Sequence, residues 1–121
     1  MDPIDFIRVA EGLRAFEIGD LDEAFNRTAA NRAYLGTVLF ISDLLESRFG
    51  VVIPRSSRFY RELEGSLEGI LDYRRLEQLM ELRRLRICAD YDWQTDFTDA
   101  DSRKALRLAK DLLQGISMKY Q

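Results

Sequence analysis

The sequence predicts an all-α protein, an up-and-down bundle of four to five antiparallel helices that forms a single domain over residues 1–121. Apolar residues recur three or four positions apart along most of the chain, which is typical of helices with one buried face. Two prolines and seven glycines in 121 residues suit long helices with short joints. The one strand-like run, Val51-Val52-Ile53, has no second run to pair with, and we interpret residues 51–57 as a buried connector.

The first helix is expected from Asp2 to about Ile18. Asp2 is a suitable N-cap, and Pro3 suits the first helical position. Gly19 ends this helix, and Asp20 caps the next one. Its predicted buried stripe consists of Phe6, Ile7, Val9, Ala10, Leu13, Ala15 and Phe16.

The second helix is expected to be the longest, from Leu21 to about Phe49, with Gly50 ending it. Apolar residues cover so much of its circumference that a central place in the bundle is predicted. Small residues on this helix would let another backbone approach closely: Ala29, Ala30, Ala33 and Gly36.

Three further helices are expected in the C-terminal half. The third runs from Ser56 or Ser57 to about Leu67 and the fourth from about Asp72 to Ala89. Thr98, with Asp101 three positions later, caps the fifth in a pattern like a capping box. Residues expected to face inward are Leu76, Leu79, Met80, Leu82 and Leu85 in the fourth helix, Trp93 and Phe97 in the following loop, and Ala105, Leu106, Ala109, Leu112, Leu113 and Ile116 in the fifth.

The composition excludes several kinds of active site. Histidine is absent and Cys88 is the single cysteine, so the usual catalytic triads, zinc ligand sets and intrachain disulfides are excluded. The glycines are dispersed and form no phosphate-cradling loop. We therefore predict no catalytic residue, no metal and no cofactor. A reduced cysteine, the absence of a signal peptide and the absence of a membrane-spanning run lead us to expect a cytoplasmic protein.

Charge is distributed unevenly along the chain. The net charge is −3, yet residues 54–88 carry eight arginines and six carboxylates. The overall acidity argues against broad, unspecific nucleic-acid binding. The arginine-rich segment is either a salt-bridged helix surface or a local anion site.

The end of the fourth helix carries the residues of greatest interest. Residues three or four apart share a helix face, which places Arg83, Arg86 and Asp90 in one row after Leu76 and Leu79. A carboxylate is disfavoured at a helix C-terminus, so we expect Arg83 or Arg86 to pair with Asp90 or Asp92. Such a cluster could be a loop staple or a binding site.

The stretch LRRLRICADYD from Leu82 to Asp92, followed by Thr98-Asp99-Ala100-Asp101 and residues 105–113, resembles HEPN domains (higher eukaryotes and prokaryotes nucleotide-binding). Residues 29–34, Ala-Ala-Asn-Arg-Ala-Tyr, resemble the second-helix motif of that family. The resemblance covers roughly residues 20–118. It implies an up-and-down helical bundle, frequent homodimers and, as a partner, a minimal nucleotidyltransferase in toxin–antitoxin-like pairs.

The chain departs from the family pattern at one position. Many HEPN proteins are metal-independent ribonucleases with an arginine, four to six residues and then a histidine, and here Asp90 stands where that histidine would be. A carboxylate with an ordinary pKa of about 4 cannot serve as the acid at neutral pH, and its charge repels the scissile phosphate.

The main hypothesis is therefore a non-catalytic HEPN-like module that binds a nucleotide, RNA or a protein partner and involves no membrane. The alternatives are a divergent ribonuclease toxin and a purely structural dimerising bundle. The candidate ligand- or partner-binding residues are Arg32, Tyr34, Arg83, Arg86, Asp90 and Tyr91.

Overall fold

The computed structural model describes residues 2–15 and 22–120, and this part of the chain contains five helices and no strand, as the sequence predicts. The helices are α1 (Ile4–Ala15), α2 (Asp22–Phe49), α3 (Phe59–Ser66), α4 (Tyr73–Tyr91) and α5 (Asp99–Tyr120). None of them is long and apolar enough to cross a membrane.

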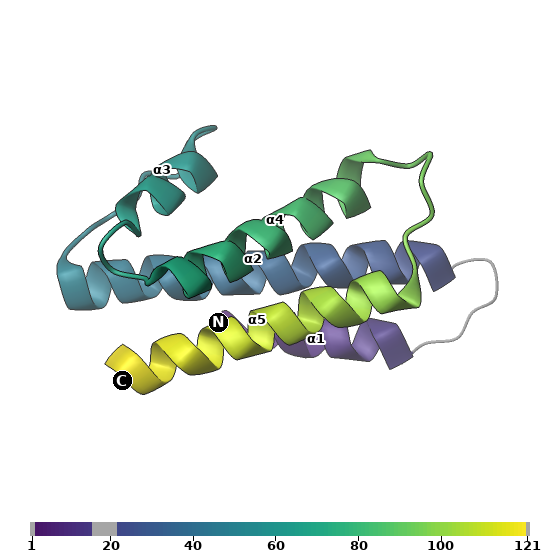
Figure 1. Cartoon of the computed structure of the whole chain (residues 1–121), viewed down its shortest axis with the longest axis horizontal. Helices are drawn as coiled ribbons and strands as arrows, with labels where there is room; N and C mark the ends of the chain where they lie inside the picture. The colour runs from purple at the N-terminus through teal and green to yellow at the C-terminus, as the bar shows by residue number, and fades with distance from the viewer. Residues whose placement is uncertain (1, 16–21, 121) are drawn as a thin grey trace.

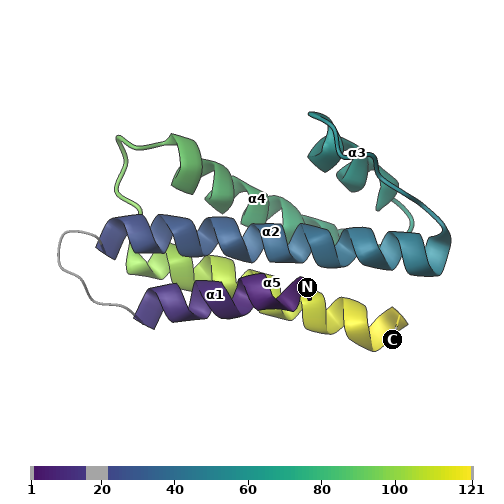
Figure 2. The same cartoon turned by 180° about the vertical axis from the view of Figure 1, so that it is seen from behind.

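Helix α2 is the central element of the bundle. It packs against each of the other four helices, whereas the backbone of α3 comes close only to that of α2 among the helices. Figures 1 and 2 show α1 and α5 along one side of α2, with α4 tilted across the other side and the short α3 beyond the C-terminal half of α2. The central place predicted for the second helix is confirmed.

Side-chain caps set three of the helix starts. Asp2 Oδ1 accepts a hydrogen bond from the backbone N–H of Ile4 at 3.0 Å, and Asp72 Oδ1 accepts one from Arg75 at 2.9 Å. Thr98 and Asp101 form the reciprocal capping box, at 2.9 and 3.2 Å. Each cap satisfies N–H groups that have no partner within the helix, so these starts follow from the local sequence.

The observed helix bounds differ from the expected ones at several ends. Helix α3 begins at Phe59, and α4 continues two residues past Ala89, so the loop before α5 begins at Asp92. Gly50 ends α2 with a left-handed backbone, φ +66°, which glycine adopts without steric cost. Predictions for five residues lie outside the described part of the chain: Phe16, Ile18, Gly19, Asp20 and Leu21.

At Gly36 the beginning of α1 and the residue before it lie close against α2. A Cβ atom at this position would lie 2.9 Å from the carbonyl oxygen of Pro3 and 3.1 Å from side-chain atoms of Phe6 and Ile7. The prediction that small residues on α2 admit another backbone is confirmed here.

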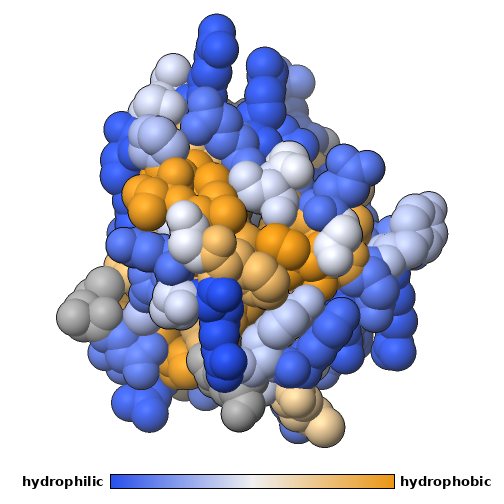
Figure 3. Space-filling view, turned by 90° about the vertical axis from the view of Figure 1, so that its left-hand side faces the viewer, coloured by the Kyte–Doolittle hydropathy of each residue, from blue (hydrophilic) through white to orange (hydrophobic). Residues whose placement is uncertain are grey.

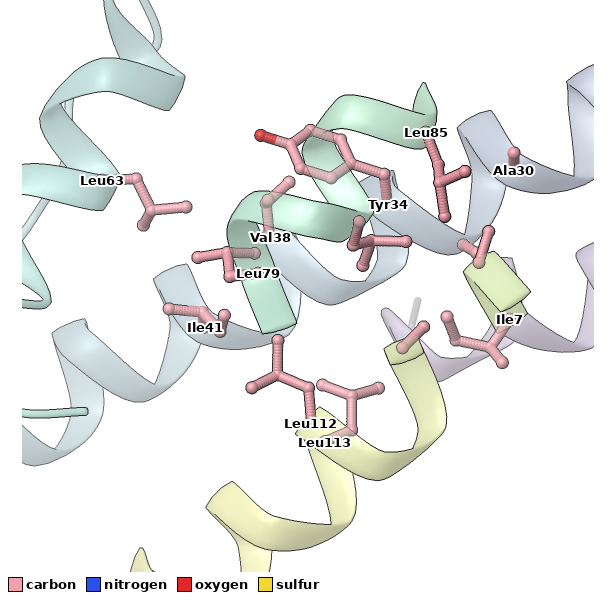
Figure 4. Close-up of a cluster of buried hydrophobic side chains, with 14 of the residues drawn as sticks. Ile7, Ala30, Tyr34, Val38, Ile41, Leu63, Leu79, Leu85, Leu112 and Leu113 are labelled. Carbon is pink, nitrogen blue, oxygen red and sulfur yellow. The ribbon is translucent and has the colours of Figure 1, made fainter. Parts of the chain in front are cut away.

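The core draws side chains from all five helices. Figure 4 shows Ile7 of α1, Tyr34 and Ile41 of α2, Leu63 of α3, Leu79 of α4 and Leu112 of α5 among the buried cluster. The inward face predicted for α5 is confirmed in full, since these residues are buried: Ala105, Leu106, Ala109, Leu112, Leu113 and Ile116.

Four residues predicted to be inside the bundle are exposed. Val9 is 49% exposed because Ile7 and Ala10 take the inward side of α1, and Ala15 is exposed as well. Met80 is 60% exposed, since it lies about 100° around the helix from Leu79. Trp93 is 78% exposed, while Phe97 is buried. These predictions were wrong because apolar character alone does not choose between two neighbouring helix faces.

The connector after α2 is only partly buried, because Ile53 lies in the core while Val52 is 66% exposed. Figure 3 views the end of the molecule where α2 ends and shows an apolar area framed by hydrophilic side chains. This connector and the C-terminal end of α5 lie at the same end of the bundle (Figure 1).

Candidate functional site

The Arg86 guanidinium lies among three tyrosine rings. Its central carbon is 5.7 Å from the ring centroid of Tyr34, 5.6 Å from that of Tyr60 and 5.5 Å from that of Tyr91. The rings belong to α2, α3 and α4, so one cation joins three helices. Cation–π contacts of this kind strengthen when the cation is partly desolvated, and the Arg86 side chain is 19% exposed.

Asp90 completes this arrangement. Its Oδ2 lies 2.8 Å from Arg86 Nε and accepts a hydrogen bond from Asn31 Nδ2 at 3.0 Å. The Arg86 Nε–H does not point at the carboxylate well enough to make a hydrogen bond, so the pair is an electrostatic contact. The predicted ion pair between Asp90 and an arginine is confirmed. Because the charges of Arg86 and Asp90 already have partners within the fold, the cluster serves to hold α4 against α2.

Arg83 forms a looser pair on the neighbouring turn. Its Nε lies 3.5 Å from Glu64 Oε1 on α3, and this buried carboxylate oxygen has no hydrogen-bond partner within the described residues. Burial raises the pKa of Glu64, and the nearby Arg83 cation opposes that rise. Arg83 keeps almost half of its side chain exposed. It is thus the arginine of this cluster that an anion can reach.

Tyr34 is enclosed and cannot meet a ligand without rearrangement. It is buried, and its ring lies 5.5 Å from that of Tyr60. Burial raises the pKa of the Tyr34 phenol, and the Glu64 carboxylate adds to this rise, so the phenol stays neutral. Tyr60 and Glu64 were not among the predicted site residues. Sequence spacing gave no signal for them, because α3 is brought to α4 only by the tertiary fold.

Of the remaining two predicted site residues, Arg32 lies apart from this centre and Tyr91 belongs to it. The Arg32 guanidinium lies over the Phe6 ring of α1 at 5.9 Å, on the side of α2 that α1 covers. Tyr91 contacts Arg86 but is 70% exposed. The structure therefore joins Tyr34, Arg86, Asp90 and Tyr91, connects Arg83 through Glu64, and places Arg32 elsewhere.

Arg27 of α2 makes the main set of contacts that the sequence did not indicate. Its Nη1 donates to the backbone oxygens of Cys88, Ala89 and Asp92 at 3.0, 3.1 and 3.0 Å. Its Nη2 donates to Glu23 at 3.0 Å and to the Thr95 backbone oxygen at 2.6 Å. One guanidinium thus caps the C-terminal carbonyls of α4 and fixes the loop behind it.

A small cavity of about 160 Å³ lies beside this loop. Arg84 Nη1 donates to Cys88 Sγ at 3.9 Å there, and three carboxylates line the wall: Asp92, Asp96 and Asp101. Residues 2–15 and 22–120 contain no group of three or more Cys, Asp or Glu side chains placed to hold a metal ion.

The outer face of α4 carries a row of exposed residues at spacings of four and three: Tyr73, Glu77, Met80, Arg84, Ile87 and Tyr91. We call this row the α4 stripe. Tyr73 is 76% exposed, Met80 60% and Tyr91 70%, although all three carry large apolar side chains. An open groove with mainly apolar walls runs along the first half of the stripe, beside Leu76.

Comparison of the chain with family models, with curated proteins and with solved structures finds no match.

Proposed function

We propose that this chain is a non-catalytic interaction module that binds a protein partner through the α4 stripe. The observation that carries the proposal is the exposure of Tyr73, Met80, Ile87 and Tyr91 on one line of a surface helix. The outward face of such a helix is ordinarily polar. Exposed apolar side chains gathered along one line indicate an interaction surface. The alternating spacings of four and three, with Glu77 and Arg84 between the apolar residues, form the seam that a second helix packs against.

The Arg86 cluster supports this function as a positioning device. Arg86, Asp90 and Asn31 join α4 to α2, and Tyr60 joins α3 to the same point. Holding α4 in one rotation about its axis determines which of its residues face solvent. With Asp90 paired to Arg86, neither group is placed to act on a phosphate, which favours binding over the ribonuclease alternative.

The partner class follows from the geometry of the seam. An amphipathic helix laid along α4 would bury the apolar side chains and could meet Glu77 and Arg84 with opposite charges. The HEPN resemblance adds a minimal nucleotidyltransferase, in a toxin–antitoxin-like pair, as one protein that could supply such a helix.

Co-purification with matched variants tests the proposal. Met80→Glu places a charge in the middle of the stripe, and Met118→Glu places one on α5, where the methionine is 80% exposed. We expect Met80→Glu to lose proteins that Met118→Glu and the unaltered chain retain, with circular dichroism unchanged for both. Identical sets of bound proteins for all three chains would contradict the proposal.

A nucleotide or RNA is the second candidate ligand, and Trp93 favours it. The Trp93 Nε1–H donates to the Asp90 backbone oxygen at 2.7 Å, which holds an exposed indole face close to Tyr91 in the chain. Exposed aromatic rings stack on bases, and Arg83 offers a cation about two turns before Tyr91 on α4.

Trp93 is the only tryptophan in the chain, so its fluorescence reports on that ligand directly. Titration with ATP or a short single-stranded RNA is expected to quench the emission, and Arg83→Ala to weaken the effect. Unchanged emission at millimolar ligand would rule this candidate out. Arg86-dependent shortening of the RNA in the same samples would instead favour the ribonuclease alternative.

A further inference from the structure

We propose that a groove between α1 and α5 is a binding site for one carboxylate group, which is bound by Arg107. The carboxylate belongs either to a small organic acid or to an acidic side chain of another protein. The groove shares no residue with the α4 stripe or with the Arg86 cluster, so this inference goes beyond the proposed function.

Two ion pairs between α1 and α5 lie toward the two ends of the groove. Arg14 Nη2 donates to Asp99 Oδ1 at 2.9 Å, and Lys110 Nζ lies 2.5 Å from Glu11 Oε1. The two helices run antiparallel, side by side (Figures 1 and 2). The space along them measures about 470 Å³, which is within the range of roughly 300–1,000 Å³ for ligand pockets in proteins.

Arg107 lies on α5 between these two ion pairs and lines the groove with an exposed side chain. Among the described residues, including Asp111 four positions further along α5, no carboxylate pairs with Arg107. A guanidinium presents five N–H donors in a fork that matches the two oxygens of a carboxylate. The donors of Arg107 are therefore available to an anion from outside the chain.

Arg103 adds a second cation one turn before Arg107. Its Nε lies 3.0 Å from Asp99 Oδ2, and its side chain is 62% exposed. Asp99 thus pairs with two arginines, Arg14 and Arg103, and can neutralise only one of them. This end of the groove keeps a positive charge that supports an anion held by Arg107.

The charges around the groove favour a ligand with one negative charge. The cations are four: Arg14, Arg103, Arg107 and Lys110. The carboxylates that lie with them are three: Glu11, Asp99 and Asp111. Four positive and three negative charges leave a net charge of +1, which one carboxylate neutralises. A phosphate monoester carries about −1.5 to −2 charges at pH 7, and its excess charge would be repelled by the carboxylates at the rim.

The wall of the groove has an apolar part as well. Leu106 lies in it and is 5% exposed. The arginine and lysine side chains beside it present aliphatic stems below their charged ends. A carboxylate attached to an apolar group therefore fits better than a small hydrophilic acid, and an aromatic acid such as benzoate is a suitable probe.

Titration with benzoate, followed by the backbone amide and arginine Nε–H signals in NMR spectra, tests the site. We expect saturable shifts within residues 103–111, with a dissociation constant of about 1 mM, and no such shifts with the uncharged benzamide. Arg107→Gln is expected to weaken binding about tenfold, whereas Arg58→Gln, which removes an exposed arginine before α3, leaves it unchanged. Binding that survives Arg107→Gln, or an equal response to benzamide, would overturn the proposal.

A matched pair of charge variants tests whether the groove itself attracts the carboxylate. Asp111→Asn removes a negative charge from the rim, and Glu46→Gln removes one from the exposed side of α2. We expect Asp111→Asn to strengthen benzoate binding about threefold and Glu46→Gln to have little effect. Equal strengthening by both variants would show a general effect of net charge and would contradict a site in this groove.

Two further probes identify the source and the chemistry of the anion. An acetylated and amidated dipeptide of phenylalanine and glutamate represents an acidic protein side chain. Binding of this peptide more tightly than benzoate, with the same dependence on Arg107, supports a protein as the source, and the reverse order supports a small acid. Phenyl phosphate bound more tightly than either would refute the assignment of the site to a carboxylate.

Discussion

Replacing Arg27 by methionine is expected to destabilise the fold more than any exposed substitution. The Arg27 side chain is 14% exposed and donates to four backbone oxygens and the Glu23 carboxylate. Methionine keeps the apolar stem, packed near Phe97, and removes the donors. The carbonyls of Cys88 and Ala89 at the end of α4 would then lose their side-chain partner.

The size of the effect can be worked from these contacts. A hydrogen bond from a charged group contributes about 1.5–3 kcal/mol, and a cation at a helix C-terminus about 0.3–1 kcal/mol. Two of the backbone oxygens, those of Asp92 and Thr95, lie in exposed surroundings where water can replace the guanidinium. The contacts therefore do not add in full, and we expect a loss of about 2–4 kcal/mol in the free energy of unfolding.

Urea unfolding followed by circular dichroism measures this loss, with two controls. Arg27→Lys keeps the charge but not the forked geometry, and is expected to lose about half as much. Arg107→Met removes an exposed arginine from α5 and is expected to stay within about 0.5 kcal/mol of the unaltered chain. An Arg27→Met chain as stable as Arg107→Met would refute the assignment of Arg27 as the cap of α4.

Three further predictions concern stability. Gly36→Ala is expected to destabilise the fold by about 1–2 kcal/mol, because the added methyl meets the backbone of α1. Gly12→Ala, with nothing within 4 Å, is expected to stabilise it by about 0.5–1 kcal/mol; thermal melts showing the same sign for both would contradict the packing. Hydrogen bonds from Arg84 and then Lys104 lower the pKa of Glu81 from 4.5 to about 2. Its carboxylate thus stabilises the fold above pH 4.5, and this contribution, about 1 kcal/mol after solvent screening, is lost as the pH falls toward 2. Urea unfolding at pH 7 and pH 3 measures how much stability is lost on acidification, and this loss should be smaller for Glu81→Gln than for the unaltered chain. An equal loss in the two chains would contradict this role of the Glu81 carboxylate.

Local interactions explain what could be predicted from the sequence. The caps at Asp2, Asp72 and Thr98 each join residues two or three apart, so their geometry follows from the chain itself. The pair of Arg86 with Asp90 is likewise one helical turn long. For the same reason, hydrophobic periodicity alone was enough to predict the all-α class and the approximate positions of the five helices in the sequence.

The candidate site was predictable only in part, because its partners come from distant segments. The sequence indicated Arg86 and Asp90 but gave no sign that Tyr60 would lie against Arg86 or that Arg27 would cap α4. The HEPN resemblance and the binding of a nucleotide stay predictions.

The sequence by itself determined where α1, α4 and α5 begin, because hydrogen bonds between residues two or three positions apart satisfy their first N–H groups. Only the tertiary structure decided which side of α4 faces solvent. That helix has apolar residues on two sides, with Leu79 on one and Met80 about 100° away on the other. Hydrophobic periodicity alone does not distinguish these two sides. The packing of α4 against α2 and α5 decides between them, because it buries Leu79 in the core and leaves Met80 exposed to solvent.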